Sequence, residues 1–354
     1  MKNMKKLFTA IFSTILMLTL VSGCGNGNDK QTLKVFNWGE YIDMDVIHAF
    51  EEEFDVRVVY DTFESNEAMY SKISAGSVSY DVIFPSDYMV ERMIKEDMLE
   101  ELDYSKIPNL SNIQEDLLKA DFDPEQKYSV PYFWGTVGIV YDQTIVKANE
   151  VTSWDILWNE KYNQQIYMYN SSRDSMMVAL KRLGYSMNTQ DQSQITAATA
   201  ALIEQKPIVY GYVTDEVISS MANSQAALAV VYSGDATSIM RENSNMAYAI
   251  PKEGSNIWID PMVIPKSAEE KDLAHEFINF LARADIALLN TEEVGYSTPN
   301  NATLDLLSAE GEEWITWLSY NPDLDTLTNM EFFHAGSDEL LEIYNKAWED
   351  VISA

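Results

Sequence analysis

Apolar and polar positions alternate in two ways along the first hundred residues of the chain. Three short apolar or β-branched runs have the length and composition of buried strands, at residues 33–36, 56–60 and 81–84. Each is followed by apolar residues at helical spacing, over residues 43–54, 64–75 and 87–98. This alternation predicts a parallel sheet flanked by helices.

The same alternation returns in the second half of the chain. Strands are predicted at residues 166–169 and 228–232, each before a helix, at residues 174–183 and 236–241. Between residues 263 and 290 we expect a strand and one long helix with Phe277, Leu281 and Leu288 in register. Residues 338–352 place their apolar side chains on one helical face.

Two extended segments connect these halves, at residues 131–140 and 247–261. We therefore predict an α/β protein of two lobes, with the ligand cleft between them. The first lobe is expected to comprise residues 31–135 with 261–300. The second is expected to comprise residues 136–260 with 301–354.

The N-terminus has the pattern of an export signal. Three lysines precede an apolar run over residues 7–21, which is short for a membrane span. The following segment, Val21-Ser22-Gly23-Cys24, resembles the lipobox of bacterial lipoproteins. Cys24 is the single cysteine and cannot form an internal disulfide. We expect residues 1–23 to be a lipoprotein signal peptide, residues 24–30 a flexible tether, and lipid on Cys24 to anchor the exported protein at the outer face of the membrane.

The charge of the chain is strongly negative. It has 56 acidic and 24 basic residues, a formal net charge of −32. Such a surface repels nucleic acid and attracts cations. No nucleic-acid partner is therefore expected.

Aromatic and acidic residues gather where the predicted strands end. In open parallel sheets, this edge is where ligands bind. The candidate ligand-binding residues at these ends and in the connecting segments are Trp38, Glu40, Tyr41, Ser86, Asp87, Tyr88, Ser171, Asp174, Tyr232, Asp235, Trp258, Asp260 and Tyr296. Carboxylates at helix N-termini offset the positive end of the helix dipole, and aromatic faces attract cations. This combination favours an organic amine as the ligand.

Each candidate also has a structural interpretation. Trp38 taken alone is as well explained by core packing. Asp87, Asp174 and Asp235 stand where N-caps and first-turn acids are common, so capping is the better single-residue interpretation. The coincidence of rings and acids at every junction is what favours binding.

The motifs of nucleotide binding and of serine hydrolases are absent from the sequence. The three histidines, His48, His275 and His334, are far apart in sequence, so we expect no metal and no cofactor. Three other functions stay open. They are a solute-binding protein for a sugar or another organic cation, an anchored hydrolase that uses a carboxylate pair from among Glu40, Asp174 and Asp260, and an acidic adhesin.

At the same residues the chain resembles the spermidine/putrescine-binding proteins of bacterial polyamine ABC importers. The resemblance covers residues 33–300 and, more loosely, the rest. It rests on strings such as "FNWGEYI", "YDVIFPSDYMVERM", "PKEGSNIWIDPMVIP" and "VGYSTPNNA". It implies a two-lobed periplasmic-binding-protein fold that closes on a polyamine, putrescine or spermidine, and delivers it to a permease. The chain would be a monomer with no catalysis of its own.

The resemblance also implies roles for individual residues. Rings that sandwich the methylene chain correspond to Trp38, Tyr41, Tyr88, Trp258 and Tyr296, and groups that receive ammonium ends correspond to Glu40, Ser86, Asp174 and Asp260. Tyr232 stands where the family usually has tryptophan.

Three departures from the family pattern concern ligand length. Ser171 replaces an aspartate of spermidine binders, and Phe333 replaces a polar residue. Asp235 matches an acid of putrescine-preferring members. The preferred amine length therefore stays open.

Overall fold

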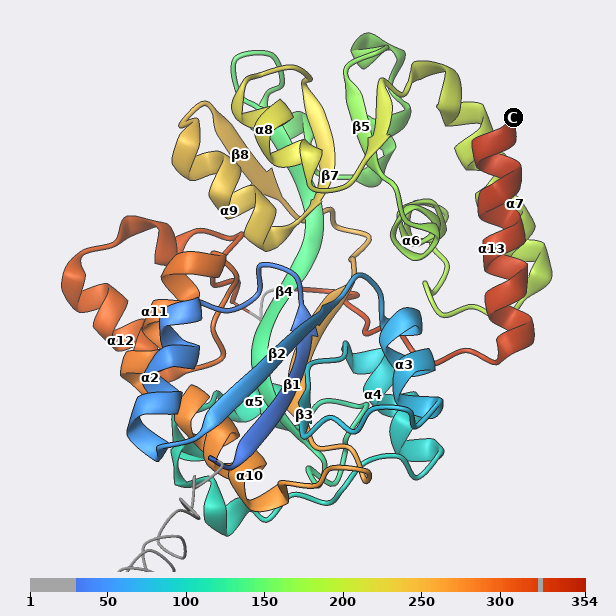
Figure 1. Ribbon diagram of the computed structural model, residues 1–354. Helices are drawn as coiled ribbons and strands as arrows, with labels where there is room; N and C mark the ends of the chain where they lie inside the picture. Colours follow the sequence, from blue (N-terminus) through green and yellow to red (C-terminus); the bar gives the residue numbers. More distant parts are fainter. Residues whose placement is uncertain (1–29, 324–326) are drawn as a thin grey trace, which may run out of the picture.

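A computed structural model of the chain describes residues 30–323 and 327–354. It shows two lobes, one above the other, joined through a single nine-stranded sheet (Figure 1). The predicted signal peptide, Cys24 and the tether up to residue 29 lie outside the described residues.

The first lobe is built from three parallel strands that occupy one end of the sheet in the order β2-β1-β3. Their bounds are β1 Thr32–Trp38, β2 Arg57–Phe63 and β3 Val82–Ile83. The helices that follow them are α2 Met44–Phe54, α3 Asn66–Ser74 and α4 Asp87–Lys95. Asp43 and Ser65 cap the first two of these helices through side-chain hydrogen bonds to backbone N–H groups. The alternation predicted for this half is confirmed.

The second lobe repeats this arrangement at the other end of the sheet, with strands in the order β7-β5-β6. The strands are β5 Ile166–Tyr169, β6 Gly211–Val213 and β7 Leu228–Tyr232. The helices are α6 Ser172–Arg182, α7 Gln192–Gln205, α8 Glu216–Ala222 and α9 Ser233–Glu242. Their apolar side chains form two clusters, which cover both faces of these strands.

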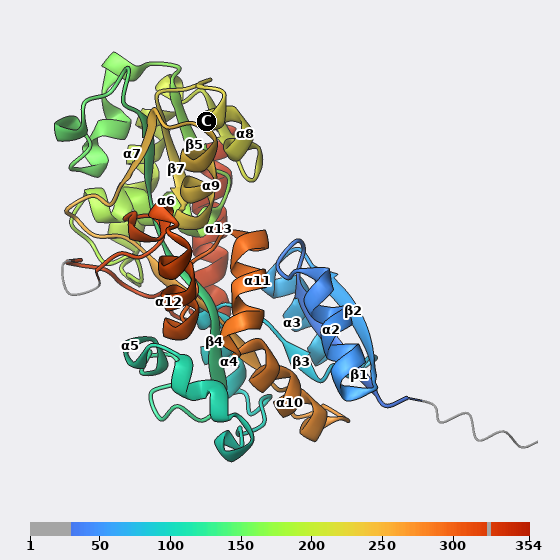
Figure 2. The ribbon, with the colours of Figure 1, turned by 90° about the vertical axis from the view of Figure 1, so that its left-hand side faces the viewer.

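Two antiparallel strands join the lobes and lie between the two sets of parallel strands that the sequence predicts. The first, β4 Ser129–Asp142, is buried along its whole length and passes from one lobe into the other (Figures 1 and 2). Its first half pairs with β9 Ile257–Val263, and its second half pairs with β7 and with β8 Met246–Ala249. Mixed sheets of this kind are common, and the pattern of apolar residues along a segment does not report the direction in which it pairs.

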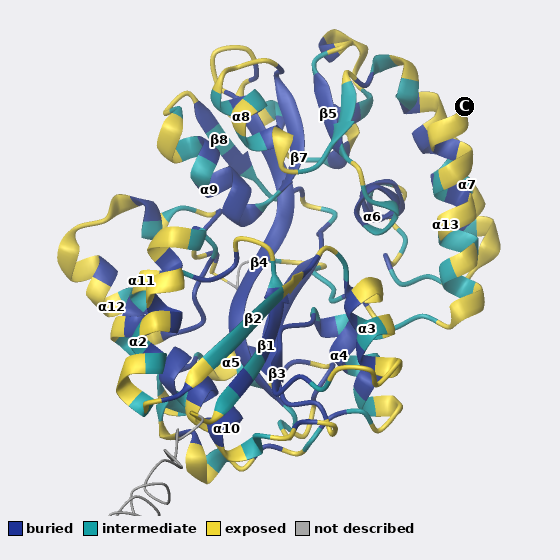
Figure 3. Ribbon diagram, viewed as in Figure 1, coloured by how far each residue is buried: buried dark blue, intermediate teal, exposed yellow. Residues whose placement is uncertain are grey.

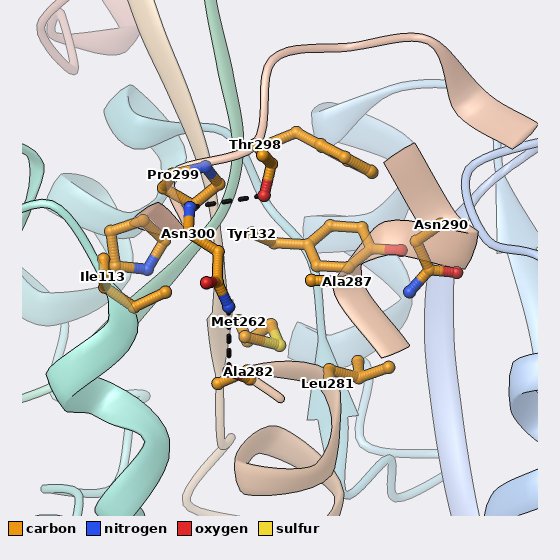
Figure 4. Close-up of a pocket in the computed structure, with 12 residues that line it drawn as sticks. Ile113, Tyr132, Met262, Leu281, Ala282, Ala287, Asn290, Thr298, Pro299 and Asn300 are labelled. Carbon is orange, nitrogen blue, oxygen red and sulfur yellow. Dashed lines mark hydrogen bonds between the residues drawn. The ribbon is translucent and has the colours of Figure 1, made fainter. Parts of the chain in front are cut away.

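The prediction of a single long helix before residue 290 is wrong, because the structure has two helices there. They are α10 Lys271–Leu281 and α11 Ala284–Val294. Arg283 between them is extended, with φ −68° and ψ 142°. The side-chain amides of Asn112 and Asn300 both donate to the carbonyl of Ala282, at 3.1 and 2.9 Å. The bond from Asn300 is drawn in Figure 4. These two long-range bonds take up a carbonyl that a continuous helix would use itself.

The last elements divide between the lobes. Helix α12, Asn301–Glu310, packs against α11 of the first lobe, whereas α13, Asp338–Ser353, packs against α6 and α7 of the second. Leu307, Trp314 and Tyr320 form a small core with Leu288 of α11. These contacts favour a lobe boundary after Tyr320 instead of at residue 301, where the sequence analysis placed it.

The remaining elements are short. They are α5 Glu115–Leu118 and the 3₁₀ turns Tyr104–Lys106, Pro108–Asn112, Ala148–Glu150, Trp154–Trp158, Glu160–Tyr162, Lys206–Ile208 and Glu313–Thr316. The central strands and the inward faces of the helices are buried, whereas the edge strands β2 and β6 are mostly half-buried and the exposed residues lie chiefly on outer helix faces and loops (Figure 3). Within residues 30–323 and 327–354, no helix has the length and apolar composition that spanning a bilayer requires.

Candidate ligand-binding site

Three buried carboxyl groups lie where the two lobes meet, and each accepts a hydrogen bond from a tyrosine. Tyr41 donates to Asp260 at 2.8 Å, Tyr232 to Asp174 at 3.0 Å, and Tyr296 to Asp235 at 3.0 Å. The acids are only 7, 3 and 9 % exposed, respectively. The Tyr296–Asp235 bond joins the loop after α11 in the first lobe to α9 in the second.

Strand ends and helix starts position these side chains. Tyr232 is the last residue of β7, and Asp235 lies in the first turn of α9. Asp174 lies in the first turn of α6, whose N-cap is Ser171. The Ser171 hydroxyl accepts a hydrogen bond from the backbone N–H of Asp174 at 3.3 Å. Asp174 and Asp235 are therefore first-turn acids and not N-caps.

Trp258 and Asp260 come from β9, where a spacing of two puts both side chains on one face of the strand. Glycines make room for the neighbouring rings. A Cβ atom on Gly135 would lie 2.7 Å from the Trp258 ring, and one on Gly234 would lie 1.7 Å from the Tyr296 ring. The absence of side chains at these two positions lets both rings reach the site.

Five rings form a continuous row through the site. Successive centroid distances are 5.0 Å for Tyr169–Tyr232, 5.9 Å for Tyr232–Trp258, 5.4 Å for Trp258–Tyr296 and 5.7 Å for Tyr296–Tyr41. All four contacts are edge-to-face, a favourable geometry for aromatic pairs. Tyr169 was missed in the sequence analysis, although its position at the end of β5 was a visible signal.

Burial shifts the acids toward their neutral forms. Desolvation raises the pKa of Asp235 and of Asp260 to about 7 each, and it also raises the pKa of Asp174. The hydrogen bonds from tyrosine partly offset these rises. Among the described residues, Asp174 Oδ1 and Trp258 Nε1 are buried with no hydrogen-bond partner. A ligand that donates hydrogen bonds and carries positive charge would satisfy Asp174 and favour the ionised acids.

The segment Ser86–Tyr88 supports Asp260 from the first lobe. The Ser86 hydroxyl is the largest of the effects that lower the pKa of Asp260 against its burial, and Asn66 holds Ser86 through hydrogen bonds of 3.0 and 3.1 Å. Asp87 accepts from the backbone N–H groups of Tyr88 at 2.6 Å and Ile259 at 3.2 Å. Burial raises the pKa of Asp87 well above its ordinary value. Asp87 thus holds β9 beside Asp260, and its carboxyl is already occupied by backbone donors.

Trp38 and Glu40 lie further along the β1–α2 loop. The ring of Trp38 packs against Phe63 at 4.5 Å, and Glu40 is exposed with φ 50°. Contact of these two residues with a ligand stays a prediction.

Two cavities flank this region. One of about 420 Å³ is lined by Tyr88 and Ser171, together with residues of α13 and the segment before it. The other lies beneath Tyr132 and Thr298 (Figure 4) and holds only about 10 Å³, room for one water molecule at most. The larger cavity falls within the usual range for small-molecule sites.

Among residues 30–323 and 327–354, no group of three or more potential ligands is arranged to hold a metal ion. His275, the most buried histidine, accepts a hydrogen bond from the backbone N–H of Asp103 at 3.0 Å. Its role is structural.

Two lobes around a crossing strand pair, with a buried polar site between them, define the class of solute-binding proteins. The family model described as "Bacterial extracellular solute-binding protein" matches residues 45–317. The spermidine/putrescine-binding periplasmic protein of Escherichia coli (strain K12) is 35% identical over 333 residues, 93% of this chain and 95% of that protein. The putrescine-binding periplasmic protein SpuD of Pseudomonas aeruginosa is 34% identical, covering 83% and 86% respectively. The chain belongs to the bacterial extracellular solute-binding proteins, in the family of the spermidine/putrescine-binding periplasmic proteins.

Solved structures agree with this assignment. The spermidine/putrescine ABC transporter substrate-binding protein PotD from Streptococcus pneumoniae superposes with a TM-score of 0.81 at 39% identity, covering 91% of this chain and 99% of that one. The TpPotD lipoprotein of Treponema pallidum superposes with a TM-score of 0.79 at 28% identity, with the same coverage. The predicted two-lobed fold and the predicted family are both confirmed.

Proposed function

We propose that the chain binds a polyamine between its lobes and delivers it to the permease of an ABC importer. One observation carries the proposal, the three buried tyrosine–carboxyl pairs along a row of aromatic rings. The acids supply counter-charges for ammonium groups, and the ring faces between them cover the methylene carbons.

Each acid would bind the ammonium group at one particular end of the ligand. Asp260, supported by Ser86 and Tyr41, receives one ammonium. Asp174 and Asp235, on the second lobe, receive another, and the unpartnered Oδ1 of Asp174 supplies a free acceptor. Trp258 lies between these two ends. A sugar would also use rings and acids, but it brings no charge to compensate three desolvated carboxylates.

Closure of the lobes on the ligand would present the loaded form to the permease. The Tyr296–Asp235 bond supports this role, because it spans the lobes and depends on their separation. The protein acts as a monomer without catalysis of its own. The names of its relatives, a periplasmic binding protein and a transporter substrate-binding protein, support a role in transport.

Export and lipid anchoring at Cys24 complete the proposal. They rest on the residues 1–24 described above and on the periplasmic and lipoprotein designations of two relatives. The protein would be held at the outer face of the membrane, beside its permease.

A thermal-shift panel tests ligand class directly. Putrescine, spermidine, spermine, agmatine, arginine and maltose are compared at equal concentrations, since stabilisation grows with ligand concentration relative to Kd. We expect one or more of the polyamines to raise Tm, and neither arginine nor maltose to do so. A shift with maltose alone would support the sugar-binding alternative, and no shift with any amine would contradict polyamine binding.

A further inference from the structure

The cavity of about 420 Å³ beside Ser171 differs in charge from the acid cluster. Glu67 is the single carboxylate among the described residues that line it. Glu67 lies exposed, and it already accepts a hydrogen bond from the Tyr88 hydroxyl at 3.2 Å. Most of the remaining lining is apolar, aromatic or amide. In a chain of net charge −32, this is an unusual environment next to a cation-binding site.

Arg173 brings a positive charge into this cavity. Its Cζ lies 4.0 Å from the centroid of the Tyr88 ring and 5.7 Å from that of Phe333. The Tyr88 ring therefore already carries a guanidinium at cation–π distance. A ligand ammonium cannot take the same place over the ring. The predicted role of Tyr88, covering a ligand's methylene chain, is thus restricted to whatever ring surface Arg173 leaves free.

The charge of Arg173 also acts on the neighbouring ammonium site. Burial raises the pKa of Asp174, and the positive charge of Arg173 is among the effects that oppose this rise. The guanidinium is therefore within electrostatic range of the carboxyl that would bind one end of the ligand. A further ammonium entering the cavity beyond Asp174 would face a like charge with little carboxylate to offset it.

We propose that Arg173 makes this cavity a place for an uncharged acceptor group and not for an ammonium, so that the site prefers diamines, and triamines acylated at one end, to the free triamine. This inference rests on the polyamine function proposed above. The acyl carbonyl oxygen would accept a hydrogen bond from the guanidinium, which is a donor only. Phe333, Leu340 and Tyr344 would cover the acyl carbons.

The test is isothermal titration of the wild-type protein with putrescine, spermidine and the two N-acetylspermidine isomers. We expect putrescine and at least one acetylated isomer to bind about tenfold or more tightly than spermidine, a difference of ~1.4 kcal/mol. Spermidine binding more tightly than both isomers would overturn the inference while leaving polyamine binding intact. Failure of every amine to bind would instead contradict the proposed function.

Variants of the same helix isolate the charge. Arg173→Met should reduce the difference in affinity between putrescine and spermidine, whereas Arg173→Lys should preserve this difference. Arg182→Gln is the matched control, because Arg182 also lies on α6 over a ring, that of Trp158 at 4.2 Å, and pairs with Asp155 away from the cavity. Ser171→Asp adds a carboxylate to the cavity and should also favour spermidine. If both Arg173→Met and Ser171→Asp fold and keep the wild-type ratio of putrescine to spermidine affinity, the inference is overturned.

Discussion

Tyr41, Tyr232 and Tyr296 place their hydroxyls where an incoming ammonium group would donate its hydrogen bonds. They donate a hydrogen bond to one oxygen of each buried acid at 2.8 to 3.0 Å. These neutral donors reduce the cost of burying Asp174, Asp235 and Asp260, none of which forms a salt bridge within the described part of the chain. An ammonium then adds charge compensation that the hydroxyls lack.

Asp260 and Trp258 can be compared by mutation. Asp260→Asn removes the charge opposite one ammonium, which should weaken binding by roughly 2–5 kcal/mol, whereas Trp258→Leu loses a cation–π contact worth about 2 kcal/mol or less. Because burial already favours neutral Asp260, Asp260→Asn should keep the ligand-free Tm. Calorimetric titration and unfolding of both variants check this. Lost stability with near-normal affinity would mean that these residues serve packing alone.

Single residues were predictable where composition was unusual. Trp258 with Asp260, and Tyr232 with Asp235, stood out because rings and acids coincide at strand ends. Three residues were not foreseen: Asn66, which holds Ser86, Arg173, which covers Tyr88, and Tyr169, which extends the row of rings. Asn66 reaches Ser86 across 20 residues of sequence, and Arg173 of the second lobe reaches Tyr88 of the first. Spacing along the sequence does not report such contacts. Asp87 had the right composition, but its carboxyl binds the backbone of β9.

At the scale of elements, periodicity located the βα units in both lobes, since each buries an apolar face that its sequence displays. It failed for α10 and α11, whose apolar registers run together across Ala282. The break depends on Asn112 and Asn300, which reach Ala282 from distant parts of the chain. Periodicity also carries no information on the direction of β9, which is set by pairing with β4.

The start of α9 offers a test at this scale. Gly234→Ala places a Cβ atom 1.7 Å from the Tyr296 ring, which must then move and lose its bond to Asp235. We expect polyamine affinity to fall at least about tenfold, or ~1.4 kcal/mol. In the control, Gly211→Ala on β6, the new Cβ would meet its nearest neighbour, in Tyr167, at an ordinary 3.5 Å. Titration of both variants measures the effect, and equal affinities would show that the Tyr296 position is unimportant for binding.

At the scale of the whole molecule, two acids have a pKa raised to about 7. As the pH rises, their contribution to the stability of the fold should fall while ligand binding strengthens. Asp235 and Asp260 hold their protons more tightly when folded, so their stabilising contribution is greatest below pH 3.8 and is lost as the pH rises through 7. Ammonium binding needs their charged forms. The increase in Tm produced by saturating putrescine should therefore grow from pH 5 to pH 8.

Tm measurements with and without putrescine across this pH range give the answer. The Asp260→Asn variant should show a flatter pH dependence, because one of the two titrating groups is gone. A wild-type ligand effect that is constant from pH 5 to pH 8 would contradict the assignment of both acids to the ammonium site.

Attachment to the membrane is predicted to depend on one atom, the sulfur of Cys24. Cys24→Ala should release the protein into the soluble fraction without changing ligand affinity, since every candidate ligand-binding residue lies between residues 38 and 296. Fractionation and mass spectrometry of the mature N-terminus check this. An unmodified Cys24, or a mature chain that begins elsewhere, would refute the prediction.

The strand β4 spans both lobes and is buried along its whole length; its first half pairs with β9, and its second half lies between β7 and β8. The amide hydrogens of its ladder are therefore shielded from solvent whether the lobes are apart or together. Their exchange with deuterium requires the whole sheet to come apart, so the two lobes should unfold as one cooperative unit. A gene cut within β4 would give two fragments, each with an unpaired strand edge, and neither should fold alone.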